Sequence, residues 1–225
     1  MKKYLSEGSS NSKTKKNVRD TLILYMSPAK QNSIGRNLCP KASAGCLASC
    51  LYTAGRGAFS NVQKARAERT EMWIHQPDVM MYSIAKQINI RAKRVTELAV
   101  RLNGTSDTNI VDRLLNRHAI RENVVFYDYT KIRERSVFKD TLPNRYVVTF
   151  SRSEDNEHEA LDVLANGGIV AVVFDKLPDT WNGYPVVDGD ERDDLMLDIP
   201  GGTVLGLKAK GQAKKDQSGF VIKIK

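Results

Sequence analysis

The three cysteines of the sequence, Cys39, Cys46 and Cys50, are the residues whose type and spacing point most directly to chemistry. An odd number of cysteines cannot all pair as disulfides, so at least one thiol is left for another use. Three neighbouring thiolates can bind a metal centre on one side and leave its other side open to a ligand. We therefore expect these cysteines to bind a [4Fe–4S] cluster with one iron free for a cofactor.

Two other interpretations of the cysteines stay open. A closed structural zinc site needs four ligands. The sequence offers three histidines for the fourth position, His75, His118 and His158. None of them lies near the cysteines in sequence. The remaining interpretation is three thiols that bind no metal.

Short apolar segments alternate with helix-like segments along most of the chain. The segments expected to be strands span residues 21–26, 98–102, 123–127, 146–150, 169–174, 201–208 and 220–225. Strands and helices in turn, with short connections, are typical of a parallel sheet covered by helices. The prediction is a single α/β domain over residues 21–225, whose mostly parallel sheet forms a partial or complete (β/α) barrel. A cysteine-rich loop should follow the first strand.

Two polar segments are expected to lie outside this core. Residues 1–20 are rich in Ser, Asn and Lys and lack apolar periodicity, which predicts a flexible basic arm. Residues 187–194 are rich in carboxylates, but their spacing does not match a calcium loop. A solvated turn is the better interpretation of that segment.

Small polar and charged residues follow nearly every expected strand at its carboxyl end. Parallel α/β folds bind ligands at this edge of the sheet, so we expect a site there. The candidates for acid–base catalysis are Asp128, Lys131 and Asp175. The candidates for contact with a substrate or phosphate are Arg56, Tyr129, Lys208 and Lys210.

The sequence is basic, with 35 Lys and Arg against 26 Asp and Glu and a net charge of +9. Such a charge favours polyanionic partners, here nucleic acid or a nucleotide. No apolar run reaches the roughly 20 residues needed to cross a bilayer, and the amino-terminal residues lack the apolar core of a secretory signal. We expect a cytoplasmic protein, because reduced, clustered cysteines more often bind metal or react there.

A series of motifs gives the chain a family resemblance. In order they are Cys-Pro-Lys-Ala-Ser-Ala-Gly-Cys with a further Cys, Thr-Ala-Gly-Arg-Gly, Arg-Leu-Asn-Gly-Thr-Ser-Asp, Tyr-Asp-Tyr-Thr-Lys, Thr-Phe-Ser-Arg-Ser-Glu-Asp-Asn and Gly-Leu-Lys-Ala-Lys-Gly. This series resembles the uncharacterised bacteriophage family known as gene product 88, over residues 21 to about 221. The family name records no reaction.

More loosely, the expected architecture is similar to that of radical S-adenosylmethionine enzymes. Those enzymes usually separate their cysteines by three and two residues, whereas the gaps here are six and three. Asn103-Gly104-Thr105 stands where they usually carry Gly-Gly-Glu. The resemblance implies S-adenosylmethionine at the free iron. Its amino group would bind Asn103 with Ser106 or Asp107, and its carboxylate or ribose would bind Ser151 and Arg152.

Three classes of function follow as expectations. The first is a phage-encoded iron–sulfur enzyme of radical type that acts on a nucleic acid or nucleotide in the host cytoplasm. The second is a non-enzymatic phage protein that binds nucleic acid or a host protein and uses its cysteines for a structural zinc ion. The third is a hydrolase or transferase with a metal-free site, which leaves the grouping of the cysteines unexplained.

Overall fold

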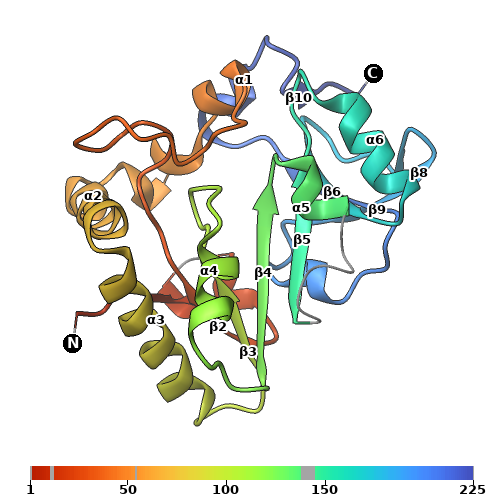
Figure 1. Cartoon of the computed structure of the whole chain (residues 1–225). Helices are drawn as coiled ribbons and strands as arrows, with labels where there is room; N and C mark the ends of the chain where they lie inside the picture. The colour runs from red at the N-terminus through yellow and green to blue at the C-terminus, as the bar shows by residue number, and fades with distance from the viewer. Residues whose placement is uncertain (1, 11–12, 54, 138–144, 225) are drawn as a thin grey trace.

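A ten-stranded sheet forms the framework of the computed structural model, which describes residues 2–10, 13–53, 55–137 and 145–224 (Figure 1). Its strands are β1 (Ser6–Glu7), β2 (Asp20–Ile23), β3 (Leu98–Arg101), β4 (Val124–Thr130), β5 (Tyr146–Ser151), β6 (Ile169–Phe174), β7 (Thr180–Trp181), β8 (Tyr184–Asp188), β9 (Thr203–Lys208) and β10 (Val221–Ile222). The helices are α1 (Ala44–Ala48), α2 (Ser60–His75), α3 (Pro77–Ala92), α4 (Ile110–Arg117), α5 (Arg133–Val137) and α6 (Glu157–Ala165).

The sheet is mostly parallel, as the alternation of strands and helices predicts. Strands β2, β3, β4, β5, β6, β9 and β8 lie side by side in that order, and each is parallel to its neighbour. Of the strands that the structure describes, only the outer strands β1 and β7 pair antiparallel. Among the described strands the hydrogen-bonded path thus ends at β1 on one side and β7 on the other. The single mixed α/β sheet is confirmed, whereas a complete barrel is not.

The two faces of the sheet are covered differently, because alternate residues of a strand point to opposite sides. On one face, Val100 and Phe126 belong to a core that includes Met80 and Ile84 of α3. On the other face, Ala99, Tyr127, Ala171 and Leu205 pack around Met196. Burial on both faces explains why the central strands are apolar almost without interruption.

The amino-terminal segment differs from the expected flexible arm, because its described residues pack against the body of the protein. Tyr4 and Leu5 are each 2% exposed and belong to the core beside α3. The backbone N–H groups of both residues donate to the side-chain oxygen of Gln87, at 3.0 and 3.3 Å. Two buried apolar side chains therefore fix a segment whose composition predicts disorder.

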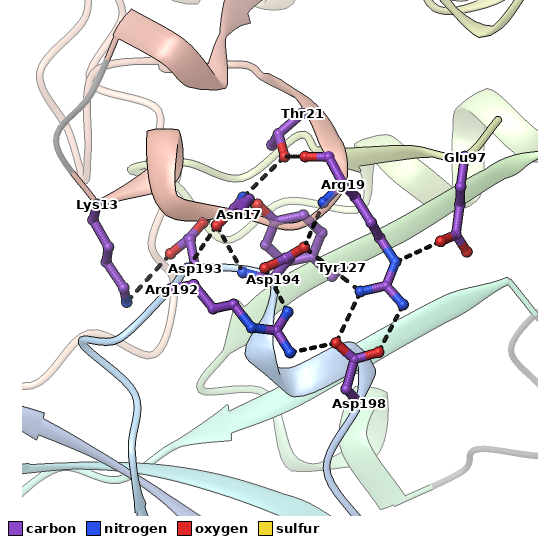
Figure 2. A network of polar contacts seen from close by, with 10 residues as sticks. All are labelled: Lys13, Asn17, Arg19, Thr21, Glu97, Tyr127, Arg192, Asp193, Asp194 and Asp198. Carbon is purple, nitrogen blue, oxygen red and sulfur yellow. Dashed lines mark hydrogen bonds and ion pairs between the residues drawn. The ribbon is translucent and has the colours of Figure 1, made fainter. Parts of the chain in front are cut away.

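A network of polar contacts joins this segment to residues 192–198, far along the chain (Figure 2). The Asn17 side-chain oxygen accepts from the backbone N–H groups of Asp193 and Asp194, at 2.8 and 3.2 Å. The Arg19 guanidinium donates to both oxygens of Asp198, at 2.6 and 2.9 Å. Asp193 and Asp194 are 3% and 0% exposed. The prediction of a solvated turn at residues 187–194 is therefore wrong for Asp193 and Asp194. Both carboxylates are buried and form ion pairs with the amino-terminal segment, Asp193 with Lys13 and Asp194 with Arg19.

Candidate functional site at the carboxyl ends of the parallel strands

A pocket of about 320 Å³ lies at the carboxyl ends of the parallel strands. Its walls include residues at or just beyond the ends of β3, β4, β5, β6 and β9, for example Asn103, Lys131 and Lys208. The segment that carries α1 forms a further wall, and Figure 1 shows it (orange) beyond the tip of the β4 arrow. The position is the usual ligand-binding edge of parallel α/β sheets, and the volume suits a small molecule.

All three cysteines line this pocket. Cys39 lies in the loop after β2, Cys46 lies inside the short helix α1, and Cys50 follows that helix. The segment is therefore partly helical rather than the single cysteine-rich loop expected. Ser43 precedes the helix, and its hydroxyl accepts from the Cys46 backbone N–H at 3.1 Å, as an N-cap residue does.

Glu154, in the loop between β5 and α6, holds the start of α1 in place. Its carboxylate accepts from the Ser43 hydroxyl at 2.7 Å and from the Gly45 backbone N–H at 2.6 Å. The approach of the chain is so close that a Cβ atom on Gly45 would lie 2.2 Å from the Ser218 oxygen and 2.8 Å from the Phe220 Cβ. The loop after β5 and the carboxyl-terminal segment therefore determine where α1 presents Cys46.

The surroundings of the cysteines favour the protonated thiol. Burial raises the pKa of the Cys39 thiol to about 11, and the sulfur also accepts from the Ala29 backbone N–H at 3.4 Å. Burial raises the pKa of the Cys46 thiol as well, although the positive charge of Lys131 acts against this. Only the thiolate binds metal, so a metal centre here would have to displace protons from buried thiols.

The surroundings of the histidines differ from those that the zinc interpretation needs. His75 pairs with Glu71 on α2, at 3.2 Å, and the His118 ring packs at a tilt against Tyr82. None of His75, His118 and His158 is among the described residues that line the pocket. Within the described ranges, no group of three or more His, Cys, Asp or Glu side chains is arranged to hold a metal ion.

Asn103 and Ser106 line the pocket, but neighbouring groups use their polar atoms. The Asn103 amide donates to the Asp128 carboxylate at 3.0 Å, and its oxygen accepts from the Ser106 hydroxyl at 3.1 Å. Asp128, expected as a catalytic acid or base, is fully buried behind Asn103 and is not among the lining residues. Burial raises the pKa of Asp128 to about 6 against the opposing effects of Arg101, Arg135 and Asn103. In this arrangement Asp128 positions Asn103.

Asp107 joins the ends of β3 and β4 at the pocket wall. Its carboxylate accepts from the Thr130 hydroxyl at 2.9 Å and from the Lys131 backbone N–H at 2.8 Å. It also forms an ion pair with Arg135 at 2.6 Å. Through these three contacts the Asp107 carboxylate holds the ends of β3 and β4 together. The amino group of S-adenosylmethionine, which is expected to bind Asp107, would have to compete with these contacts.

Ser151 and Arg152 follow each other in sequence but have different surroundings. Ser151 lines the pocket and accepts from the Lys131 ammonium at 2.8 Å. Arg152 is 5% exposed, and its guanidinium donates to the Phe220 carbonyl at 3.2 Å and to Glu157 at 2.7 Å. Arg152 thus fixes the segment before β10 and is not among the residues that line the pocket.

Two of the residues expected at the site are placed elsewhere. Asp175 is exposed, and its carboxylate accepts from the backbone N–H groups of Lys176 and Ile224 at 2.7 and 3.0 Å. Arg56 is exposed and donates to the Ser10 carbonyl at 3.0 Å. Neither belongs to the pocket lining. Both use their charge to join neighbouring segments of the surface.

The remaining basic and aromatic candidates do line the pocket. Lys208 and Lys210 form ion pairs with Asp188 at 3.1 Å and Asp190 at 2.7 Å. Tyr129 also lines the pocket, and the Arg101 guanidinium lies over its ring, 4.6 Å from the ring centroid. The basic residues that the sequence predicts at this edge of the sheet, Lys208 and Lys210, therefore do lie at the pocket.

Several pocket residues carry no motif in the sequence. Arg101 and Lys13 line the pocket and both pair with Asp193, at 3.1 and 3.4 Å. Burial alone would raise the pKa of Asp193, but these two cations and the Tyr127 hydroxyl outweigh it and lower the pKa to about 2. In the sequence, the charge of Arg101 at the end of an apolar strand is the signal that could have identified it as a pocket residue. Nothing in the sequence connects Lys13 with a residue so distant.

Together, these observations place the chain among α/β proteins that carry a small-molecule-sized pocket at the carboxyl edge of a parallel sheet. The family model described as gene product 88 matches residues 3–224. The chain therefore belongs to the gene product 88 family, as its motifs indicate. No curated protein matches the sequence, and no solved structure matches it either. Within the described residues, no helix is long and apolar enough to cross a membrane.

Proposed function

We propose that this phage-family protein is an iron–sulfur enzyme whose [4Fe–4S] cluster is bound by Cys39, Cys46 and Cys50. The observation that carries this proposal is that the chain's three cysteines all line one pocket, at the carboxyl ends of the parallel strands. Thiolates are the usual ligands of iron–sulfur clusters. A cluster held by three of them keeps one iron available to a second molecule in the same pocket.

The ligand types at the pocket favour a cluster over a single zinc ion. A closed zinc site needs four ligands, whereas three thiolates bind a cluster and leave one iron open. All three cysteines line the pocket, and no histidine is among its described lining residues.

The second molecule in this proposal is S-adenosylmethionine, to which the cluster would supply an electron. Asn103, Ser106, Asp107 and Ser151 line the pocket and offer polar atoms to it. Arg152 would act indirectly, because it positions the carboxyl-terminal wall. In the same proposal the sheet curves as a partial barrel around the pocket, and the enzyme works in the host cytoplasm.

Anaerobic reconstitution with iron and sulfide tests the cluster directly. We expect close to four irons and four sulfides per chain, broad visible absorbance and, after reduction, an electron paramagnetic resonance signal. Replacing any one of the three cysteines by Ser should remove most of the absorbance. Ser49→Ala, at another pocket-lining position between two of the cysteines, is the matched control and should reconstitute normally. Colourless protein with one bound zinc would replace the iron–sulfur proposal with the structural-zinc one.

The net charge of +9 supports a second candidate function, in which the protein binds nucleic acid or a host protein without catalysis. Binding to DNA and RNA at several salt concentrations tests the nucleic-acid form. Retention that falls steeply with salt and survives Cys46→Ser would favour it. Binding that needs the intact cysteines would instead point to a nucleic-acid substrate of the enzyme.

A further inference from the structure

The Lys131 ammonium differs from the other cations of the pocket. Lys13 and Arg101 pair with Asp193, Lys208 with Asp188 and Lys210 with Asp190. Lys131 is only 9% exposed, yet no described carboxylate forms an ion pair with its ammonium. A buried cation without a counter-ion is costly, so an anion from a ligand would complete this site.

The partners that Lys131 does have leave room for such an anion. Its ammonium donates to the Ser151 hydroxyl at 2.8 Å and to the Ser151 carbonyl at 3.3 Å, and it lies 5.6 Å from the centroid of the Phe220 ring. An ammonium has three N–H donors. Ser151 therefore occupies two of them, and both Lys131 and Ser151 line the pocket.

Tyr129 provides an independent observation at the same strand end. It also lines the pocket, and its hydroxyl is buried without a hydrogen-bond partner among the described residues. Tyr129 is the last residue but one of β4, and Lys131 directly follows the end of that strand. Buried hydroxyls normally find a partner. A ligand that reaches Lys131 could provide that partner.

The rest of the pocket indicates the remainder of the ligand. Its lining includes apolar side chains from the segment around α1, from β6 and β9, and from the segment before β10, namely Leu47, Leu51, Val173, Leu207 and Phe220. Such walls favour an apolar or aromatic body. We propose that Lys131 and Ser151 bind the carboxylate or phosphate of a small molecule with an apolar or aromatic body, and that the Tyr129 hydroxyl binds a second polar atom of it.

This site shares Ser151 with the proposed S-adenosylmethionine position but does not depend on the cluster, so the test uses the full chain after removal of iron. Inorganic phosphate, acetate and, as the ionic-strength control, chloride are added during limited acetylation, and the modification of Lys131 is followed by mass spectrometry. Phosphate or acetate should slow modification of Lys131 well below the rate in chloride. Equal rates in all three salts would overturn the proposal.

Titrations with matched ligand pairs distinguish the two sources of the anion. AMP against adenosine tests a phosphate, and N-acetylphenylalanine against its amide tests a carboxylate. In at least one pair the anion should bind about tenfold or more tightly than its neutral counterpart, as expected for a charged hydrogen bond. If neither pair shows a preference for the anion, the proposed site is wrong.

Variants connect that preference to named atoms. Lys131→Met should abolish the preference for the anion, and Tyr129→Phe should weaken binding of both members of the pair. Lys176→Met is the control, because it removes the same charge from an exposed residue that is not among the residues lining the pocket. Binding by Lys131→Met that keeps the preference would overturn the assignment. If that variant fails to fold, the acetylation experiment on the wild-type chain still decides.

Discussion

The carboxylate of Glu154 accepts the backbone N–H of Gly45 at 2.6 Å, across 109 residues of sequence. The contact joins the loop after β5 to the first turn of α1, the helix that carries Cys46. A helix this short has little stability of its own. Its position, and that of Cys46, therefore depends on contacts made by other segments.

Replacing Glu154 by Ala should loosen α1. The substitution removes two charge-assisted hydrogen bonds, which stabilise the fold by about 1–3 kcal/mol, and leaves the Gly45 N–H without its acceptor. Alkylation of Cys46 should become faster and the thermal midpoint should fall. Glu159→Ala, the same change at an exposed position in the first turn of α6, is the control; it should leave the reactivity of Cys46 unchanged and lower the thermal midpoint less than Glu154→Ala does. Unaltered reactivity of Cys46 in Glu154→Ala would show that α1 is held by other means.

Gly45→Ala should be destabilising for a steric reason. The added Cβ would lie 2.2 Å from the Ser218 oxygen, which can rotate away, and 2.8 Å from the Phe220 Cβ, which cannot, so α1 and the carboxyl-terminal segment would have to separate. Overpacking of this kind typically costs about 1–3 kcal/mol. Chemical denaturation measures the loss, and the double variant with Ser218→Ala should recover part of it. No recovery in the double variant would mean that the Phe220 contact dominates.

Cys39 should alkylate slowly at neutral pH. Its pKa is raised to about 11 from a usual value of 9.0, so its thiolate fraction at neutral pH is about a hundredfold below that of an ordinary thiol. The rate should rise about tenfold per pH unit until the pH approaches that value. Alkylation with iodoacetamide, followed residue by residue by mass spectrometry, provides the profile. A plateau below pH 9 would contradict the effect of burial on this thiol.

Cys46 should respond to the charge of Lys131. That charge lowers the pKa of the Cys46 thiol against the effect of burial, so Lys131→Met should raise the pKa and slow alkylation at a fixed pH. Lys210→Met provides the matched loss of charge from an already neutralised position and should change the rate little. Equal slowing in the two variants would point to a general effect of net charge.

Asp193 should make the fold sensitive to acid. Its pKa is about 2 in the folded protein and near 3.8 when unfolded, so its stabilising contribution is complete above about pH 4. The contribution, roughly 2 kcal/mol, is lost as the pH falls through the folded pKa. Asp193→Asn should destabilise the protein at neutral pH and flatten the dependence of the unfolding free energy between pH 4 and 2. Asp179→Asn, at an exposed position, should leave the slope unchanged.

The central strands could be predicted from the sequence because burial on both faces makes them apolar without interruption. The segment 169–174 is identical to β6, and the segment 146–150 differs from β5 by one residue. The short outer strands β1 and β7 lack such a signal, since two residues at the edge of a sheet need no apolar pattern. Packing of Tyr4 and Leu5 likewise overrides the polar composition of the segment around them.

The pocket could be predicted in part. Polar residues that end parallel strands meet at one edge, which brings Asn103, Lys131 and Ser151 to the same wall. The sequence does not reveal which strand-end carboxylates face inward. Asp128 points into the protein and Asp175 binds backbone at the surface, so neither reaches the pocket lining. The pairing of Arg101 with Asp193 is a long-range contact without any local pattern.

The joint contribution of Lys13 and Phe220 to one pocket has a consequence for synthesis of the chain. A ribosome releases residues in order, so Phe220 emerges long after Lys13 and the cysteines. The pocket cannot reach its final form until Phe220 has left the ribosome, and contacts between such distant segments form slowly. A nascent chain would therefore carry its three cysteines without the Phe220 wall until then, and reagents that modify thiols would meet an open site.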